Sequence, residues 1–351
     1  MLRQWLEPGL RGVFGVLDSC GVLDYAQPWL SGMGLILMFH RVVTPRSLNF
    51  DPGLAICSDS LDRILGYIRH RGWEIISLNQ LHDRLANGSH RQPFVCFTFD
   101  DGYADNLTIA LPIFRRHQAP LCVNVTVGYV NRTTPGWWDA LGEMLLQRNE
   151  IEFSGSGQIE RIKLGTWEEK VAAYQRLGPI LYQDVAGGRS PLGGTWTLNG
   201  VDPQALSDRF FMTWKELQEF AQDPLVQIGA HTLTHPSLKQ LRENEAGDEI
   251  EQSRQILKEK LGVEIEHFAY PFGTVDDCGQ REFRLVRELK FKTAVTTRFC
   301  NIFPAHKEHP ASLPRKSLSN YDVSEFSEST VRDRLYGEDL SLKIWKRIVL
   351  D

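Results

Sequence analysis

Two adjacent carboxylates, Asp100 and Asp101, stand at the end of a short apolar run, Phe94–Phe99, and are followed by Gly102. Adjacent carboxylates repel each other unless a cation or a shared proton relieves the repulsion. An Asp-Asp-Gly turn in water is the plainer interpretation. The apolar run that leads directly into the pair favours the alternative, a charged site at the edge of a buried core.

Two histidines four residues apart, His231 and His235, could add imidazole ligands to one of these carboxylates. This spacing predicts two side chains on one side of a helical turn, although in a chain with 10 histidines it also arises by chance. One carboxylate and two imidazoles leave an open position, which suits catalytic zinc or another divalent first-row metal. The metal would lower the pKa of a bound water toward ~7, and the second carboxylate could accept the water's proton.

The chemically active residues share one feature, because each directly follows a short apolar run that predicts a strand. They are His40 after Leu35–Phe39, Asp100 and Asp101 after Phe94–Phe99, His231 after Val226–Ala230, and the turn Pro271–Gly273 after Glu266–Tyr270. Helical patterns separate these runs, which predicts a parallel α/β sheet with right-handed crossovers. In a parallel barrel all strands end at one face, so these residues would converge there.

The elements between these strands are marked by apolar periodicity, capping boxes and terminal glycines. Helices are expected at 59–71, 77–86, 104–117, 213–221, 243–261 and 281–289, and further strands at 75–76, 121–127 and 291–297. Pro112 complicates the third helix. The glycine-rich stretch from about 131 to 209 breaks the rhythm and holds one expected helix, from the capping box at Thr166 to about Leu177, so we interpret it as an insertion.

Composition narrows the class of protein. A length of 351 residues suits a (β/α) barrel with an insertion. The net charge of −5 and the lack of a dense basic patch argue against nucleic acid as a partner. Six cysteines without paired spacing imply no disulfide framework, which suits a reducing compartment.

The N-terminal segment carries apolar residues at helical spacing. This pattern predicts a helix packed on the domain, and peripheral membrane contact is the alternative. Asp18 interrupts the apolar run at 13–17, so no signal peptide is expected, and no run approaches the ~18 residues of a spanning helix.

Three motifs, in this order, carry a family resemblance: Thr98–Gly102 (Thr-Phe-Asp-Asp-Gly), His231–His235 (His-Thr-Leu-Thr-His) and Tyr270–Gly273 (Tyr-Pro-Phe-Gly). Together they resemble the polysaccharide deacetylases of carbohydrate esterase family 4, the NodB-homology domain. The resemblance runs from about 35 to 315 and implies a distorted (β/α)7-type barrel with a helical, glycine-rich insertion. It also implies a hydrolase that removes N-acetyl groups from amino sugars with the help of a metal.

The resemblance assigns roles by position within the motifs. Asp100 would be the general base, and Asp101, His231 and His235 would bind the metal, Zn²⁺ or another divalent ion such as Co²⁺, Mn²⁺ or Ni²⁺. The backbone N–H of Phe272 would help to stabilise the oxyanion of the tetrahedral intermediate.

The sequence departs from the family pattern at two places. Many members carry an arginine that orients the catalytic aspartate, at the position that Ala269 occupies here; our hypothesis is that Arg315 replaces it, and a surface arginine is the alternative. The family's late histidine acid has no clear equivalent, because His306 and His309 lie in a proline-rich loop without a preceding strand. We therefore interpret His40 as the general acid, as in the biofilm-exopolysaccharide deacetylases, in which that motif is permuted to the N-terminus.

The sequence thus predicts an N-terminal helical segment (1–34), a polysaccharide deacetylase domain (35–320) with the insertion, and a partly helical tail (321–351). The expected enzyme hydrolyses a linear amide, releasing acetate from a bacterial surface polysaccharide or its lipid-linked precursor, in the cytoplasm or at the inner face of the membrane. The alternatives are a deformylase or other amide hydrolase acting on a sugar, and a catalytically silent carbohydrate-binding member of the fold. Trp137 and Trp138 would either stack on sugar or pack the insertion's own core.

Overall fold

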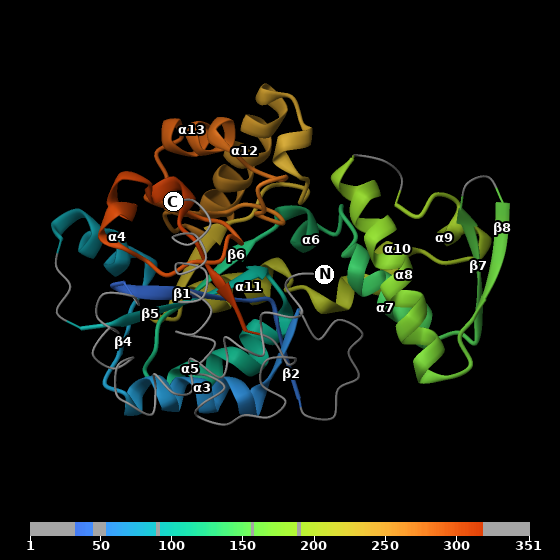
Figure 1. Cartoon of the computed structure of the whole chain (residues 1–351), viewed down its shortest axis with the longest axis horizontal. Helices are drawn as coiled ribbons and strands as arrows, with labels where there is room; N and C mark the ends of the chain where they lie inside the picture. The colour runs from blue at the N-terminus through green and yellow to red at the C-terminus, as the bar shows by residue number, and fades with distance from the viewer. Residues whose placement is uncertain (1–31, 45–53, 89–91, 156–157, 188–190, 319–351) are drawn as a thin grey trace, which may run out of the picture.

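The computed structural model describes residues 32–44, 54–88, 92–155, 158–187 and 191–318. Its main sheet consists of β1 (Gly34–Phe39), β4 (Glu74–Ile75), β5 (Phe94–Asp101), β6 (Leu121–Val125), β9 (Val226–Ala230), β10 (His267–Ala269), β11 (Thr293–Val295) and β12 (Lys316–Ser317). The strands follow the order β11-β10-β9-β6-β5-β1-β12, with β4 beside the start of β5, and all their pairings are parallel. This is the distorted (β/α) barrel that the sequence predicted (Figure 1).

A short segment joins the two outer strands of the sheet. Leu313 exchanges backbone hydrogen bonds with β11, accepting from Thr296 N at 2.8 Å and donating to Ala294 O at 2.8 Å. Three residues later, Lys316 pairs with Leu37 of β1. Arg315 lies between these two attachments, so the segment that connects the sheet's ends also carries an arginine into the barrel.

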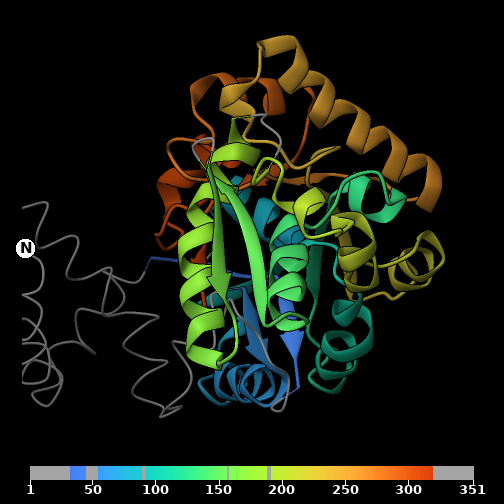
Figure 2. The same ribbon diagram turned by 90° about the vertical axis from the view of Figure 1, so that its right-hand side faces the viewer.

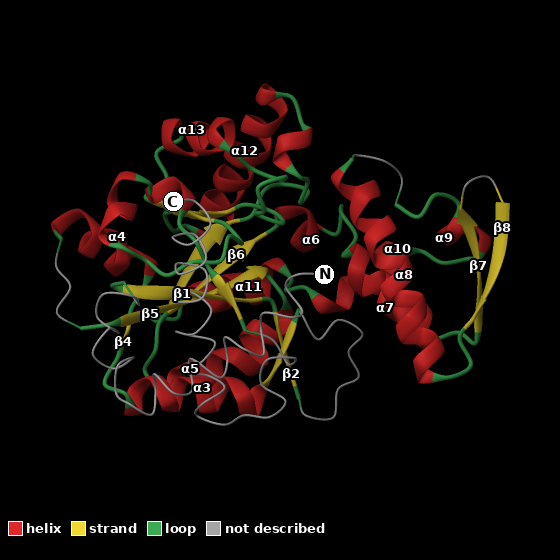
Figure 3. Cartoon of the chain, viewed as in Figure 1, coloured by secondary structure: helices red, strands yellow, loops and turns green. Residues whose placement is uncertain are grey.

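Helices cover the outside of the sheet (Figure 3). They are α3 (Ser58–His70), α4 (Leu78–Asn87), α5 (Leu111–Arg116), α6 (Val127–Asn131), α11 (Trp214–Ala221), α12 (Glu243–Leu261) and α13 (Gln280–Glu288). The capping boxes at Ser77 and Thr213 are formed as expected, and Gly262 ends α12 in the left-handed conformation. Two small strands, β2 (Arg41–Val43) and β3 (Ala55–Cys57), pair with each other next to β1.

The core of the barrel is aromatic where β1 and β5 meet. Every residue of β5 is buried. Phe39 stacks on Phe97 and Phe99, and Phe114 of α5 packs edge-on against both rings of β5. Burial of each phenylalanine contributes roughly 1.5–3 kcal/mol, so this cluster holds β5 firmly in place.

The helix expected at 104–117 is present from Ala104 to Arg116, but its hydrogen-bond pattern changes along its length. The chain forms a π-helix, η1 (Asn106–Ala110), directly before α5, which begins at Leu111. Pro112 explains the change, because it lacks an N–H and its ring would clash with the carbonyl four residues earlier in a regular α-helix. A wider turn before the proline relieves that clash.

The insertion contains more structure than the single helix expected. It consists of α7 (Trp137–Leu146), a hairpin of β7 (Glu150–Gly155) and β8 (Gln158–Lys163), α8 (Trp167–Ala186), α9 (Thr195–Leu198) and α10 (Pro203–Ser207). The Thr166 capping box starts α8 as predicted, but the helix continues through Pro179 to Ala186 instead of ending near Leu177. Figure 2 looks onto the hairpin and its flanking helices, which enclose their own apolar cluster.

The terminal predictions cannot be compared with the structure. The expected N-terminal helix and the C-terminal tail lie outside the described residues. Within the described ranges, none of the helices combines the length and apolar character that a bilayer-spanning segment requires.

Candidate metal centre and active site

The four predicted strand ends meet at one face of the barrel. Asp100 and Asp101 are the last residues of β5, and His231 follows β9 directly, its N–H bonded to Val125 O at 3.0 Å. The prediction that His231 and His235 share a helical turn is wrong, because both lie in a loop. The φ angles of Asp101 and His235, 77° and 62°, are in the left-handed region that non-glycine residues rarely adopt. Such backbone strain concentrates at functional sites and here turns both side chains toward His231.

Asp101, His231 and His235 form a compact set of metal-ligand atoms. Asp101 Oδ1 lies 3.6 Å from His231 Nε2 and 3.4 Å from His235 Nε2. One ligand atom from each residue lies within 4.8 Å of the others, and no second group of this kind occurs in the described part of the chain. Asp101 Oδ1 is buried and accepts no hydrogen bond from any residue that the structure describes. A buried carboxylate oxygen without a partner is costly, so this donor set fits a divalent cation.

Both histidines are suited to bind a metal through a neutral ring. His231 Nδ1 donates to Ala269 O at 2.8 Å, which leaves Nε2 unprotonated and facing Asp101. Metal-binding histidines commonly make this second hydrogen bond to a carbonyl. Burial lowers the pKa of His231 and, together with the nearby His231 and His40, lowers that of His235 well below its ordinary value. Neutral imidazoles are the form that metals bind.

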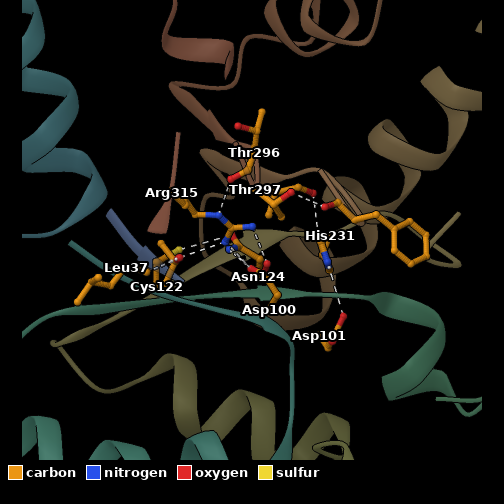
Figure 4. A network of polar contacts seen from close by, with 12 residues as sticks. Leu37, Asp100, Asp101, Cys122, Asn124, His231, Thr296, Thr297 and Arg315 are labelled. Carbon is orange, nitrogen blue, oxygen red and sulfur yellow. Dashed lines mark hydrogen bonds and ion pairs between the residues drawn. The ribbon is translucent and has the colours of Figure 1, made fainter. Parts of the chain in front are cut away.

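Asp100 is held by a buried arginine. Arg315 donates from Nη1 to Asp100 Oδ1 at 2.9 Å and from Nη2 to Asp100 Oδ2 at 2.7 Å. Asn124 Nδ2 adds a bond to Oδ1 at 2.8 Å (Figure 4). Burial acts to raise the pKa of Asp100, but the charge of Arg315 and its hydrogen bonds outweigh it and keep this pKa below its ordinary value. Asp100 therefore stays ionised inside the protein.

Arg315 occupies the position that our hypothesis required. Its side chain is 0% exposed, so the alternative of a surface arginine is wrong. Beyond Asp100, it donates to Thr98 Oγ1 at 3.1 Å and to Thr296 O at 3.0 Å. A guanidinium with this many fixed partners orients a carboxylate in a way that a flexible lysine could not. Its orienting role remains a prediction.

Asp101 behaves in the opposite way to its neighbour. Burial raises its pKa well above the ordinary value, and the charges of Asp100 and Asp139 raise it further. Among the described residues, no arginine is ion-paired with its carboxylate. Within this part of the chain, one of the two adjacent aspartates is thus paired with a protein cation, and the other lacks a cation of its own.

His40 follows β1 as expected, and its carbonyl accepts from Asn106 Nδ2 at 2.8 Å. Burial lowers the pKa of His40 to about 4, while the charge of Asp100 acts to raise it. His40 also lowers the pKa of His235, so its ring lies within electrostatic reach of the metal-ligand set. His306, by contrast, accepts from Phe303 N at 2.9 Å within its own loop.

The Pro271–Gly273 turn brings Phe272 to the site. Phe272 and Gly273 have φ angles of 59° and 66°. A Cβ at Gly273 would lie 2.7 Å from Thr297 N, so the turn requires glycine. The Phe272 N–H donates to no acceptor among the described residues, which leaves it available to an oxyanion. Its ring centroid lies 4.9 Å from that of His235.

Sequence reasoning missed a second polar cluster beside these residues. Asp139 of α7 accepts from Arg41 Nη1 at 3.3 Å and from the Tyr103 hydroxyl at 2.9 Å. Arg41 Nε also donates to Asp105 Oδ2 at 3.1 Å. Burial raises the pKa of Asp105 to about 6 and also raises that of Asp139. No spacing pattern marked these residues, although Asp139 directly follows the tryptophan pair.

The local charge also favours a cation. Four carboxylates and two guanidinium groups gather around the strand ends: Asp100, Asp101, Asp105 and Asp139 with Arg41 and Arg315. When the four carboxylates and both guanidinium groups are ionised and the histidines are neutral, the net charge of this group is −2. A divalent ion bound by Asp101 would balance that charge.

The two tryptophans both pack on the apolar cluster of the insertion, as one alternative expected. Trp137 packs on Trp196 inside the insertion, with ring centroids 6.1 Å apart. The ring centroid of Trp138 lies 5.6 Å from that of Phe272 and 6.4 Å from that of His235. Trp138 therefore also borders the candidate active site.

Comparisons with known proteins agree with this geometry. The family model described as polysaccharide deacetylase matches residues 193–288, which include His231, His235 and the Phe272 turn. The PplD deacetylase of Streptococcus pyogenes, solved with acetate, and IcaB from Ammonifex degensii each share 18% identity. Their TM-scores are 0.55 and 0.54, with 86% of this chain covered in both and 97% and 96% of theirs.

A third structure is similar in fold. The BpsB deacetylase domain from Bordetella bronchiseptica shares 16% identity at a TM-score of 0.50, covering 81% of this chain and 95% of that domain. No curated protein sequence matches the chain. The matched segment and the shared barrel confirm the resemblance to the polysaccharide deacetylase family that the three motifs predicted.

Proposed function

We propose that this protein is a metal-dependent N-deacetylase that hydrolyses the acetamide of an N-acetylated amino sugar and releases acetate. One observation carries the proposal. An ionised aspartate fixed by Arg315 stands next to a buried Asp-His-His set, one carboxylate oxygen of which has no hydrogen-bond partner in the described ranges. This arrangement offers a base and an open ligand set at one strand end, as hydrolysis of an amide requires.

Asp101, His231 and His235 would hold the metal, Zn²⁺ or another divalent first-row ion such as Co²⁺, Mn²⁺ or Ni²⁺. When bound, the metal would polarise the acetamide carbonyl and make the attacking water more acidic. The burial of the three side chains, and the hydrogen bond from His231 to Ala269, would keep this set rigid.

The protein's own groups divide the remaining work. Asp100 accepts the proton of the attacking water, and Arg315 and Asn124 keep its carboxylate ionised and oriented. The Phe272 N–H donates to the oxyanion. We assign protonation of the leaving amine to His40. Its resting ring is neutral because its pKa is about 4, so it passes on the proton that Asp100 takes from the attacking water, and this proton ends on the leaving amine.

The substrate and location remain parts of the proposal. The solved structures that share the fold are named as deacetylases, which supports a glycan substrate. We propose a surface polysaccharide or its lipid-linked precursor, acted on in the cytoplasm or at the inner face of the membrane. Fractionation of cells producing the full chain, with immunodetection in each fraction, tests the location.

The decisive experiment measures the released acid. Metal-reconstituted protein is incubated with N-acetylglucosamine oligomers, a lipid-linked N-acetyl sugar and the matched N-formyl sugar, and acetate and formate are quantified. Wild type should release acetate, and Asp100→Asn should not. Asp276→Asn serves as the control, because Asp276 is an exposed aspartate in the loop after the Phe272 turn.

Each outcome decides between the alternatives. Formate as the preferred product would favour a deformylase. Binding of the oligomers without release of either acid would overturn catalysis and leave a carbohydrate-binding member of the fold.

A further inference from the structure

The insertion contributes side chains to the candidate active site. Its first helix, α7, begins with Trp137, Trp138 and Asp139, and the second and third of these contact residues of the barrel. Tyr182 of α8 lies against the same turn, with its ring centroid 4.9 Å from that of Phe272. The insertion therefore borders the site at two separate helices.

Trp138 occupies a distinctive place there. Its indole is half-buried and packs at 60° against Phe272 and edge-on against His235. Its Nε1 donates to no group in the described ranges of the chain, and this nitrogen is not fully buried. The ring thus keeps an accessible apolar surface and an unused donor directly beside a metal ligand and the proposed oxyanion donor.

The adjacent tryptophan makes different ring contacts. Trp137 and Trp138 are both half-buried, and both pack on the apolar cluster of the insertion, which includes Leu141 and Leu177. The ring of Trp137 packs on Trp196 of the insertion, whereas the ring of Trp138 packs on Phe272 and His235 at the site. Because the two tryptophans are consecutive and equally placed on the cluster, Trp137 is the matched control for Trp138.

Polar contacts attach both bordering helices of the insertion to the barrel. Next to Trp138 on α7, the Asp139 carboxylate binds Arg41 and Tyr103, the residues that follow His40 and the Asp-Asp-Gly turn. On α8, the Tyr182 hydroxyl donates to Asp277 at 2.9 Å. Asp277 is itself buried and accepts from Ser237 at 2.9 Å. An indole platform on a helix that is anchored in this way loses little entropy when it binds a ligand.

We propose that Trp138 is a substrate-binding residue that stacks on a sugar ring of the N-acetylated glycan and thereby sets glycan specificity. This inference rests on the proposed function and names the residue through which the insertion acts. The C–H face of a pyranose is apolar, and an indole offers a large rigid apolar surface with a polar edge. Ligand sites commonly combine such a surface with a few convergent polar groups, here Phe272 N–H and the metal-ligand set.

The test separates binding from turnover. Metal-loaded full-length protein is compared as wild type, Trp138→Ala, Trp138→Phe and Trp137→Phe. KM and kcat are measured for N-acetylglucosamine pentamer. The dissociation constant for the same pentamer is measured by calorimetry. For this measurement each tryptophan substitution is combined with Asp100→Asn, so that the pentamer is not hydrolysed. Metal content and Tm are recorded for every variant.

Trp138→Ala should raise KM and the dissociation constant roughly tenfold with metal content unchanged, and Trp138→Phe should recover part of that loss. Trp137→Phe should leave both constants within about twofold, since Trp137 faces the insertion's core. Unchanged constants in Trp138→Ala would overturn the inference. Equal losses in Trp138→Ala and Trp137→Phe would also overturn it, because they would indicate a structural effect.

The same experiment distinguishes this inference from the proposed function. Pentamer binding that depends on Trp138, without acetate release from wild type, would refute the deacetylase proposal and support the platform. Acetate release by wild type, with KM and the dissociation constant unchanged in Trp138→Ala, would support the deacetylase proposal and refute the platform. Failure of wild type to bind the pentamer would overturn the platform.

Discussion

The barrel and the insertion reach the same site by different physical means. The barrel supplies polar groups at strand ends, where Asp100, Asp101 and His231 are each almost fully buried. The insertion supplies Trp138 and Tyr182, two half-buried aromatic side chains on helices. The difference suggests a division of labour, with bond-breaking chemistry on the rigid sheet and substrate selection on a body attached to it.

A second contrast lies within the barrel itself. Asp100 and Asp101 are neighbours at one strand end, yet Arg315 keeps the pKa of Asp100 low while burial raises that of Asp101. Arg315 neutralises one carboxylate, and the other is paired with no arginine or lysine in the part of the chain that the structure describes. Adjacent identical residues therefore acquire different roles from their partners alone.

The largest effect is expected for the base. Asp100→Asn should lower kcat by roughly 10²–10⁴-fold, because an amide cannot accept the water's proton. Metal content should be retained, since Asp100 does not belong to the ligand set. Steady-state acetate release and elemental analysis check both points. Activity within tenfold of wild type would show that another group is the base.

Arg315→Lys should have the next largest effect. A lysine keeps the charge but loses the two-pronged contact with Asp100, so kcat should fall about 10–100-fold. The pKa of Asp100 should rise, which moves the acidic limb of the pH–activity profile to higher pH. Arg284→Lys is the matched control, because Arg284 is half-exposed on α13. An unmoved acidic limb would argue against Arg315 as the residue that tunes Asp100.

The Asp100–Arg315 pair also links stability to pH. The pKa of Asp100 is lower in the folded chain than its unfolded value of about 3.9. The pair therefore contributes stability above that unfolded pKa, and the contribution is lost as the pH falls from there through the lower pKa of the folded chain. Denaturant unfolding of wild type between about pH 5 and pH 2 should show a steeper loss than that of Arg315→Lys.

Asp139→Asn should produce an intermediate effect that connects the two regions. The amide can still accept one hydrogen bond, but Arg41 loses a charged partner. Unfolding free energy should fall by about 1–3 kcal/mol, and kcat/KM should fall several-fold as the loops after β1 and β5 loosen. Asp202→Asn, which changes a helix cap inside the insertion, is a control for general damage. Loss of stability without any loss of kcat/KM would mean that the anchor is purely structural.

Tyr182→Phe should have the smallest effect. It removes the hydroxyl bond to Asp277 but keeps the ring against Phe272. Unfolding free energy should fall by about 1 kcal/mol, with KM within about twofold of wild type. A large rise in KM would show that the hydroxyl itself contacts substrate.

Most of the barrel could be predicted from the sequence because its signals are local. Short apolar runs that end in polar residues located the strands, and the capping boxes at Ser77, Thr166 and Thr213 located helix starts. The partners of Asp100 were harder to foresee. Arg315 reaches Asp100 across 215 residues, and only the missing arginine at Ala269 suggested looking for it.

Most elements of the insertion could not be predicted from the sequence, for a physical reason. Its hairpin leaves β8 almost wholly exposed, so the alternation of apolar and polar residues there is weak. The Asp139 cluster depends on residues 98 positions apart in the sequence, Arg41 and Asp139, which no spacing rule connects. The loop conformation of His231 and His235 could not be predicted from the sequence either, because the positive φ of His235 is imposed by its surroundings and not by its residue type.

Metal stoichiometry tests the central claim most directly, because it does not depend on knowing the substrate. Wild type, Asp100→Asn and His231→Gln are stripped, reconstituted with zinc, cobalt, manganese or nickel, freed of loose metal and analysed for metal per chain. The account predicts about one ion per chain in wild type and Asp100→Asn, and far less in His231→Gln. No bound metal in wild type, or the same content in His231→Gln, would contradict it.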